Sequence, residues 1–237
     1  MYEALHVDRP RSAPPDHAAI LERDGFAVIE NIAEAEDLVE LRATVAALLT
    51  DHQTKRRELG ERGGAPQIIE VEHITEARPE LLELDVIQKA KAISADVLKA
   101  PVEMHYDHVI YKPPMNMKET AWHQDFAYGR RLTFSARRLH WWLPLHDVDA
   151  DQSCMRFVPG SHKIGYLPHV PVAPTSDALK TELPASAQVV TCPLRAGSAT
   201  VHLPATLHGT GPNRTNRSRT ALILQFAARN WLPRLAR

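Results

Sequence analysis

Short apolar or alternating segments, separated by proline and glycine, fill the second half of the chain, and no other feature of the sequence constrains the fold as strongly. Segments of this length and composition are typical of β-strands. They cover residues 102–111, 139–145, 155–158, 188–191, 199–203 and 220–227. Several short strands in one region predict a β-sandwich or barrel.

The first part of the chain differs, because most of its apolar residues recur at helical spacing. The predicted helices cover residues 16–24, 34–50 and 79–100. Gly25 is suited to end the first helix, and a short strand follows at 26–29. We therefore expect a single domain of residues 1–237, in which residues 1–100 form a mostly helical front on a β core of residues 101–237.

The charge balance limits the partners that the chain can bind. The 28 basic and 29 acidic residues give a net charge of −1, which leaves no electrostatic footprint for nucleic acid or an anionic membrane. No apolar run is long enough to span a bilayer, and the start lacks the apolar stretch of a secretory signal. We expect a cytoplasmic protein, a monomer or a homodimer, that acts on a small molecule.

Two cysteines, Cys154 and Cys192, are too few for a disulfide framework and lack the spacing of a zinc site. The 13 histidines are the unusual part of the composition. They matter for function only if some of them meet a carboxylate around a metal ion.

His123 and Asp125 are the first candidates for such a metal site. In an extended segment alternate side chains share a face, so both can point at one ion while Gln124 points away. By itself the pair is weak evidence, because a hydrogen-bonded pair at a strand end explains it more simply.

His208 adds a second imidazole after the strand that ends near Leu203. Two histidines and one carboxylate on one face leave the opposite coordination positions open, as Fe(II) requires in order to bind a chelating co-substrate and O2 together. A structural zinc site would need a fourth ligand, which neither cysteine is spaced to supply.

Arg219 opens the last apolar strand. If this strand is the antiparallel neighbour of the strand that holds His208, its guanidinium would face the metal from deeper in the barrel and could capture a carboxylate in bidentate fashion. Thr210 lies on the same face as His208 and could add a hydroxyl. Arg219 alone would be an ordinary surface residue.

These residues together resemble a known family. The motifs are Trp122-His-Gln-Asp-Phe126, Trp142-Leu-Pro-Leu145, Val158-Pro-Gly-Ser-His162, Leu207-His-Gly-Thr210 and Arg219, with Tyr111-Lys-Pro-Pro114 and Gly25-Phe-Ala-Val-Ile29 before them. In this order and spacing they resemble the phytanoyl-CoA dioxygenase family of Fe(II)/2-oxoglutarate oxygenases, over nearly the whole chain.

The resemblance implies a mainly β fold with flanking helices, the double-stranded β-helix or jelly roll, which is cupin-like. It implies Fe(II), 2-oxoglutarate and O2 as cofactor and co-substrates, with His123, Asp125 and His208 as metal ligands. By the same motifs Arg219 and Thr210 bind the distal carboxylate of 2-oxoglutarate and Trp142 lines its pocket. His108 stands where the family commonly has a glutamine near the co-substrate, which is a departure.

The substrate is not encoded by a recognisable motif. We name Tyr128, Arg130 and His105 as candidates for substrate contact, although a core tyrosine is an equally simple interpretation of Tyr128, and a solvated arginine and an ordinary histidine are the simpler interpretations of Arg130 and His105. We interpret His140, His146, His162 and His202 as structural. Loops at 52–66, 126–138 and 165–187 are expected to line the site.

The resemblance implies release of succinate and CO2 with hydroxylation of an unactivated C–H bond in a small molecule, a biosynthetic intermediate. Desaturation, epimerisation or cyclisation can begin from the same iron site. A metal-binding jelly-roll module without turnover is the alternative of another class. A metal hydrolase is a weaker alternative, because no motif for a general base accompanies the three ligands.

Overall fold

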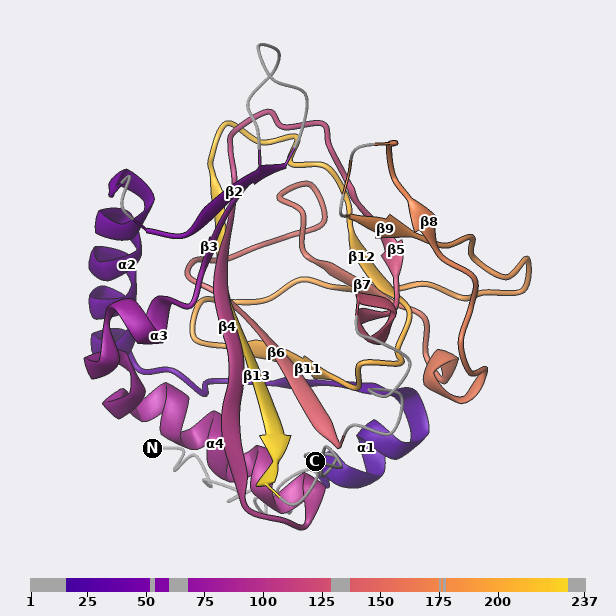
Figure 1. Ribbon diagram of the computed structural model, residues 1–237, viewed down its shortest axis with the longest axis horizontal. Coiled ribbons are helices and arrows are strands. Elements are labelled where there is room, and N and C mark those ends of the chain that lie inside the picture. Colours follow the sequence, from indigo (N-terminus) through magenta and orange to yellow (C-terminus); the bar gives the residue numbers. More distant parts are fainter. Residues whose placement is uncertain are drawn as a thin grey trace, which may run out of the picture.

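Two antiparallel sheets pack face to face in the computed structural model, which describes residues 16–51, 54–59, 68–128, 137–174, 176 and 178–229. The larger sheet has helices along its other side (Figure 1). The order of its strands is β1 (Phe26–Ile29), β11 (Ala199–His202), β6 (Arg138–Pro144), β13 (Arg219–Ala228), β4 (Val102–Lys112), β3 (Ile68–Glu72) and β2 (Arg56–Leu59). This arrangement confirms the predicted β-sandwich class.

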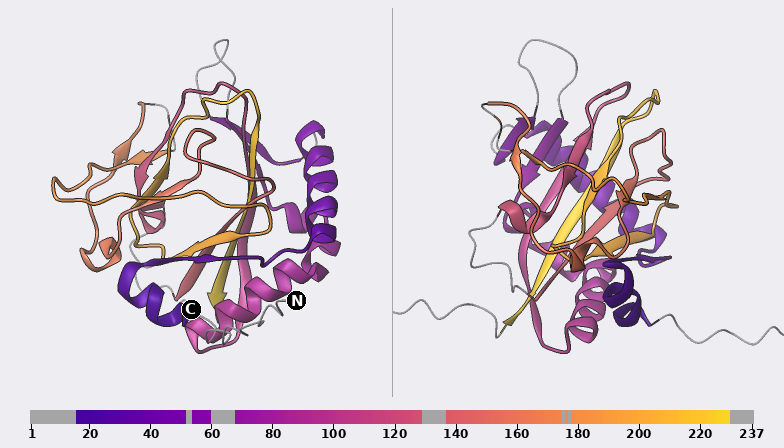
Figure 2. Two further views of the ribbon diagram at one scale, coloured as in Figure 1. Left: turned by 180° about the vertical axis from the view of Figure 1, so that it is seen from behind. Right: turned by 90° about the vertical axis from the view of Figure 1, so that its right-hand side faces the viewer.

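The smaller sheet carries shorter strands. Its order is β10 (Val190–Cys192), β7 (Met155–Phe157), β12 (His208–Thr210) and β5 (Thr120–His123). A separate pair, β8 (Val170–Pro171) and β9 (Leu179–Lys180), lies beyond β5, within the predicted excursion of residues 165–187 (Figures 1 and 2).

The helices lie mainly in the first part of the chain. They are α1 (His17–Asp24), α2 (Ala35–Thr50), α3 (Ile74–Ala77) and α4 (Asp85–Leu98), with the 3-10 helices η1 (Pro79–Glu83), η2 (Asp125–Tyr128) and η4 (Ser161–Lys163). Gly25 ends α1 at a φ of 84°, in the left-handed region that glycine adopts without strain. None of the helices in the described ranges is long and apolar enough to cross a membrane.

Two hydrophobic cores result, one on each face of the larger sheet. Trp141 belongs to the core between the helices and the sheet, where its Nε1 donates to Ser94 Oγ at 2.9 Å. Trp142 points the opposite way, into the core between the two sheets, together with Phe157 and Ile223. The alternation of strand side chains therefore decides which tryptophan faces the interior that the sheets share.

Several predictions about local structure need correction. Residues 52–66 were expected to form a loop, but Arg56–Leu59 pairs with β3 as an edge strand. The predicted helix 79–100 is divided, because Leu84 adopts an extended conformation between η1 and α4. The front part of the chain also supplies three strands to the larger sheet: β1, which was predicted, and β2 and β3, which the helical pattern around them concealed.

Candidate metal centre

His123 and His208 come together as a cross-strand pair. His123 ends β5, His208 begins β12, and the two are directly opposite in the antiparallel register. Residues opposite each other on one face of a ladder place their side chains in contact. The imidazole centroids are 4.2 Å apart, and both residues are buried.

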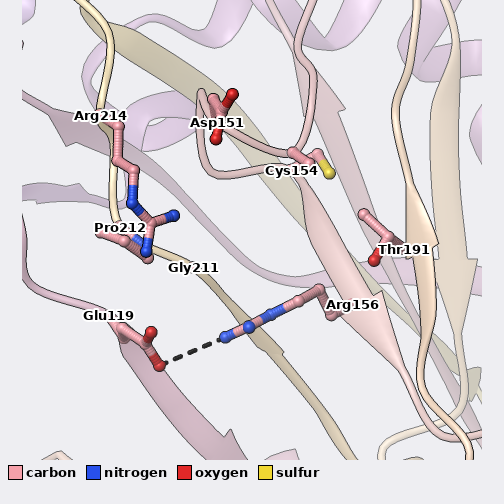
Figure 3. A pocket seen from close by; sticks show the side chains of 9 residues that line it. Glu119, Asp151, Cys154, Arg156, Thr191, Gly211, Pro212 and Arg214 are labelled. Atoms are coloured by element: carbon pink, nitrogen blue, oxygen red, sulfur yellow. Dashed lines mark hydrogen bonds and ion pairs between the residues drawn. The ribbon is translucent and has the colours of Figure 1, made fainter.

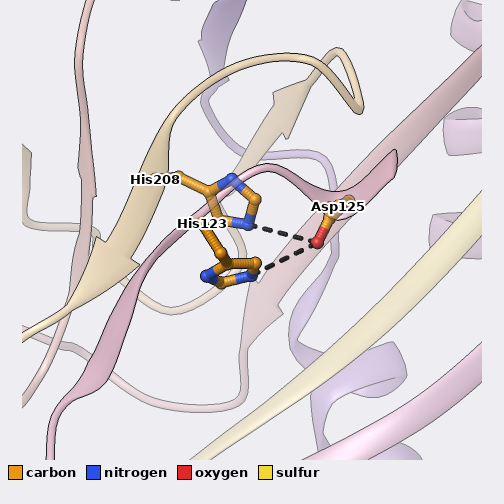
Figure 4. A group of neighbouring side chains, drawn as sticks. All are labelled: His123, Asp125 and His208. Carbon is orange, nitrogen blue, oxygen red and sulfur yellow. Dashed lines mark ion pairs between the residues drawn. The ribbon is translucent and has the colours of Figure 1, made fainter. Parts of the chain in front are cut away.

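Asp125 completes the group from the turn that follows β5. Its Oδ1 lies 3.3 Å from His123 Nε2 and 3.4 Å from His208 Nε2 (Figure 4). The predicted convergence is therefore correct but its reason was wrong, since Asp125 begins the 3-10 helix η2 rather than continuing a strand. Gln124 does point away, and its side-chain amide donates to the carbonyls of Gly165 and Ala205.

Backbone carbonyls orient both imidazoles for metal binding. His123 Nδ1 lies 2.7 Å from the Ala121 carbonyl, and His208 Nδ1 lies 2.9 Å from the Thr206 carbonyl. A carbonyl only accepts, so each Nδ1 carries the proton and each Nε2 presents its lone pair to the space beside Asp125.

The three donor atoms fit a single metal ion. Ligand bonds of about 2.1 Å that meet at about 90° place donor atoms about 3 Å apart, close to the separations of Oδ1 from the two Nε2 atoms. Two imidazoles and one carboxylate on one side of an ion, with the other positions open, suit Fe(II).

Protonation favours the same assignment. Burial would raise the pKa of Asp125, but the neighbouring His208 and His140 hold it well below its usual range, so the carboxyl is ionised. Burial lowers the pKa of His208 to about 4, which leaves this imidazole neutral. Burial would lower the pKa of His123, but the neighbouring Asp125 carboxylate and the Ala121 carbonyl hold it above its usual range.

Two further histidines meet the same carboxylate from the larger sheet. His140 Nδ1 lies 2.5 Å and His202 Nε2 lies 3.0 Å from Asp125 Oδ2. The interpretation of both as ordinary structural histidines overlooked this contact, because nothing in the local sequence relates β6 and β11 to η2. His146 and His162 do make only backbone contacts, to Thr220 and Glu22.

Arg219 and Lys112 form a buried cationic pocket between the sheets. Both side chains are almost completely buried, and neither has a carboxylate partner among the residues that the structure describes. Arg219 makes only hydrogen bonds of 3.5 Å, to Ile110 O and Ser153 Oγ, and its Nε has no hydrogen-bond partner in the described part of the chain. A buried guanidinium without a counter-ion among these residues, beside a buried lysine that an anion would protonate, indicates a site for an anion.

Thr210 and Trp142 adjoin this pocket as predicted. Lys112 Nζ donates to Thr210 Oγ1 at 3.2 Å and to Ser153 Oγ at 2.9 Å, and the Arg219 guanidinium lies 5.6 Å from the centroid of the Trp142 ring. The expected reason was wrong, however. Strand β12, which contains Thr210, pairs with β5 and β7, while β13 pairs with β4 and β6, so Thr210 and Arg219 meet across the two sheets.

Lys112 was not named as a site residue. Burial first, and the charge of Arg219 second, lower its pKa from 10.5 to about 6. The sequence offered one signal for this residue. Lys112 ends β4, in which the alternate positions before it are apolar or aromatic. Its place in the cationic pocket could be recognised only from its contact with Thr210 in the structure.

The other predicted co-substrate and substrate residues are not grouped at one position in the fold. His108 lies on the inner face of β4, opposite Ile223, and burial lowers its pKa to about 4 although Asp125 acts to raise it. Its backbone is about 13 Å from that of Lys112 along β4. Tyr128 is half exposed, and its ring lies 5.7 Å from that of His123. His105 is exposed at a bulge of β4. Arg130 lies outside the described residues.

A charged wall faces the metal ligands from β2, β3 and β4. Glu70 is opposite Ile110, and Glu72 is opposite His108, so both carboxylates share the inner face of the larger sheet. Arg57 donates to Glu70 at 2.7 Å and pairs with Glu72 at 3.0 Å. Burial raises the pKa of Glu70, which is also within range of the charge on His123.

A separate pocket lies on the smaller sheet beside Gly211 (Figure 3). Its Arg156 pairs with Glu119 at 3.3 Å and lies over the Trp122 ring. Cys154 also lines it, but burial raises the pKa of this thiol to about 11. Because Arg156 is already paired with Glu119, we assign no ligand to this pocket.

Comparison with known families gives one clear match. The sequence profile described as Phytanoyl-CoA dioxygenase (PhyH) matches residues 21–221, which include all three candidate metal ligands and Arg219. An ectoine dioxygenase from Nocardia farcinica is 24% identical over 234 residues, covering 89% of this chain and 76% of that protein. For three further curated relatives the matched region spans only about half of each protein.

Solved structures agree with the sequence match. EvdO2 from Micromonospora carbonacea var. aurantiaca, in complex with 2-oxoglutarate, is 28% identical with a TM-score of 0.76, covering 92% of this chain and 91% of that one. SnoN, a non-haem α-ketoglutarate-dependent epimerase from nogalamycin biosynthesis, is 26% identical with a TM-score of 0.73, covering 90% and 82%. The predicted jelly-roll fold is confirmed.

Substitution of Gly209 tests whether Fe(II) binding requires the close approach of β12 and β5. A Cβ there would lie 2.8 Å from the Thr120 carbonyl, so Gly209→Ala should separate the strands that hold His208 and His123. Overpacking of this kind costs about 1–3 kcal/mol, and we expect roughly tenfold weaker Fe(II) binding in an anaerobic titration.

The matched control is Gly211→Ala, whose Cβ would make only an ordinary contact of 3.8 Å with Arg156. This variant should bind Fe(II) like the parent protein. Equal affinity in both variants would show that the spacing of β12 and β5 does not set the metal site.

Proposed function

Because this chain belongs to the phytanoyl-CoA dioxygenase family and is an Fe(II)/2-oxoglutarate-dependent oxygenase, we propose that His123, Asp125 and His208 hold its iron. The observation that carries this proposal is the set of donor atoms: two Nε2 lone pairs and one carboxylate oxygen directed at a common point. The bound iron supplies oxidative decarboxylation of 2-oxoglutarate and oxidation of a substrate C–H bond. The protein's own groups bind, orient and exclude water.

We propose that the cationic pocket receives the distal carboxylate of 2-oxoglutarate. The Arg219 guanidinium offers paired donors, and Lys112 and Thr210 are close enough to bind the same carboxylate. A buried carboxylate between Arg219 and Lys112 would compensate the charge of Arg219 and favour the protonated form of Lys112. A metal-binding module without a keto-acid co-substrate has no use for them, which favours the enzyme over that alternative.

We propose a compact polar substrate that presents hydroxyl or amine donors to Glu70 and Glu72. The inner wall carries these two carboxylates against one guanidinium, that of Arg57, while Lys55 reaches Glu72 from an exposed position. A long acyl chain would remove this wall from water and offer it no polar partner in return. An osmolyte such as ectoine, the substrate named for several relatives, has the right size and polarity.

Hydroxylation of such a molecule is the proposed reaction. The ectoine dioxygenase relatives favour it. Epimerisation is the second candidate, because SnoN is an epimerase of comparable similarity. The mass of the product separates the two, since hydroxylation adds one oxygen and epimerisation adds none.

The iron and co-substrate sites can be tested without a substrate. The anaerobic Fe(II) protein should develop a visible metal-to-ligand charge-transfer band when 2-oxoglutarate is added. His208→Ala and Asp125→Ala should abolish this band and succinate formation, because each removes one of three ligands. His162→Ala, which loses only a backbone contact, should keep both. Undiminished turnover in the ligand variants would contradict the assignment.

Lys112 predicts a pH dependence of co-substrate binding. With a pKa of about 6 in the free protein, Lys112 is neutral above that pH, whereas a bound carboxylate favours its protonated form. Binding therefore takes up a proton, and the Kd of 2-oxoglutarate should rise by up to tenfold per pH unit above about pH 6.

The control is Lys112→Met, measured by the same anaerobic titration at each pH. This variant should bind 2-oxoglutarate more weakly at pH 6 and should lack this part of the pH dependence. Arg219, whose pKa is lowered by burial only to about 10, stays charged throughout. Identical pH profiles for the two proteins would exclude Lys112 from the co-substrate site.

The substrate class can be tested by succinate release. We expect stimulation by small polar amines or polyols, with ectoine as the first probe, and none by phytanoyl-CoA. For the accepted substrate, Glu70→Gln should raise KM about tenfold or more, because it weakens charged hydrogen bonds, without changing KM for 2-oxoglutarate. Glu103→Gln, on an exposed part of β4, should change neither. Stimulation by the thioester alone would contradict the proposal.

A further inference from the structure

Asp125 is held between two pairs of histidines, one from each sheet. His123 and His208 are opposite each other in the smaller sheet, and His140 and His202 are opposite each other in the larger one. The first pair faces Oδ1 of the carboxylate and the second pair faces Oδ2. The two oxygen atoms therefore have separate partners.

His140 and His202 donate hydrogen bonds to Asp125. A carboxylate that binds a metal ion is ionised, and an ionised carboxylate only accepts hydrogen bonds. His140 Nδ1 and His202 Nε2, at 2.5 and 3.0 Å from Oδ2, must therefore carry hydrogen. These nitrogens have no lone pair to offer an ion, in contrast to Nε2 of His123 and His208.

Distances also argue against a second metal ion at His140 and His202. Two donors on one ion lie about 3 Å apart or more, whereas His140 Nδ1 and Asp125 Oδ2 are at hydrogen-bond distance. The outward nitrogens, His140 Nε2 and His202 Nδ1, are buried and have no hydrogen-bond partner within the described ranges. Each ring thus directs its single polar contact at Asp125.

Packing fixes the positions of these rings. The His202 ring lies 4.4 Å from that of His208 and 5.4 Å from that of Phe157, and Phe157 is completely buried in the core between the sheets. The His140 ring lies 5.6 Å from that of His202. Little space is left for either imidazole to turn away from the carboxylate.

We propose that His140 and His202 act as a carboxylate clamp, a pair of positioning residues that hold Asp125 to the iron through Oδ1 alone. This inference rests on the proposed iron site and adds a function for residues outside the ligand set. Without the clamp the carboxylate could rotate and bind through both oxygens. A bidentate carboxylate would occupy a coordination position that 2-oxoglutarate or O2 needs.

Matched variants separate hydrogen bonding from packing. Asparagine places its amide nitrogen near the position of His Nδ1, and glutamine places its own near the position of His Nε2. His140→Asn and His202→Gln therefore keep a donor, whereas His140→Leu and His202→Met, of similar shape, remove it. Thermal unfolding of the metal-free proteins by circular dichroism identifies any variant that fails to fold.

The readouts are anaerobic Fe(II) affinity, metal stoichiometry and 2-oxoglutarate affinity at saturating iron. Loss of an outer hydrogen bond to a ligand typically weakens metal binding about 10- to 100-fold. We expect this loss in the Leu and Met variants, with one iron per chain, a raised Kd for 2-oxoglutarate and a weaker charge-transfer band. The Asn and Gln variants should bind Fe(II) within about threefold of the parent protein.

Equal affinities in the donor-keeping and donor-removing variants would overturn the clamp, as would two iron ions per chain of which His140→Leu removes one. Complete loss of iron in His140→Leu, equal to that in His208→Ala, would make His140 a ligand and would also overturn it. Absence of the charge-transfer band in the parent protein would instead refute the iron site itself.

Discussion

The buried carboxylate of Asp125 is the interaction on which the rest of the site depends. Removing an ionised carboxylate from water costs several kcal/mol unless partners compensate. Here four imidazoles surround it, two from each sheet. The same contacts join β5 and β12 to β6 and β11, so the group that is proposed to bind iron also fixes how the two sheets meet.

The interior between the sheets is divided by charge into three regions. The metal ligands occupy the middle, the cationic pair Lys112 and Arg219 lies at one end, and the wall of Glu70, Glu72 and Arg57 faces the ligands from the edge of the larger sheet. The proposed dicarboxylate co-substrate is matched by the cationic end, and the proposed polar substrate is matched by the carboxylates of the wall.

The three proposed metal ligands could be named from sequence because they belong to local motifs, and helices and longer strands could be predicted from their apolar periods. Other features depend on register between distant strands. His140 and His202 reach the same Asp125 oxygen because β6 pairs with β11 and places the two histidines opposite each other. Arg219 and Thr210 meet across two sheets rather than along one hairpin. The pairing of β3 with β4 is what places Glu70 on the inner face of the larger sheet. These contacts between distant strands cannot be recognised from any local sequence pattern.

The central claim is that one iron ion binds to Oδ1 of Asp125 while Oδ2 stays with the clamp. The most direct measurement is a crystal structure of the anaerobic Fe(II)·2-oxoglutarate complex, with iron located by its anomalous scattering. We predict a single iron ion bonded to Nε2 of His123, Nε2 of His208 and Oδ1 of Asp125, with His140 and His202 still hydrogen-bonded to Oδ2. Iron bound by both oxygens of Asp125, or by His140 and His202, would contradict this account.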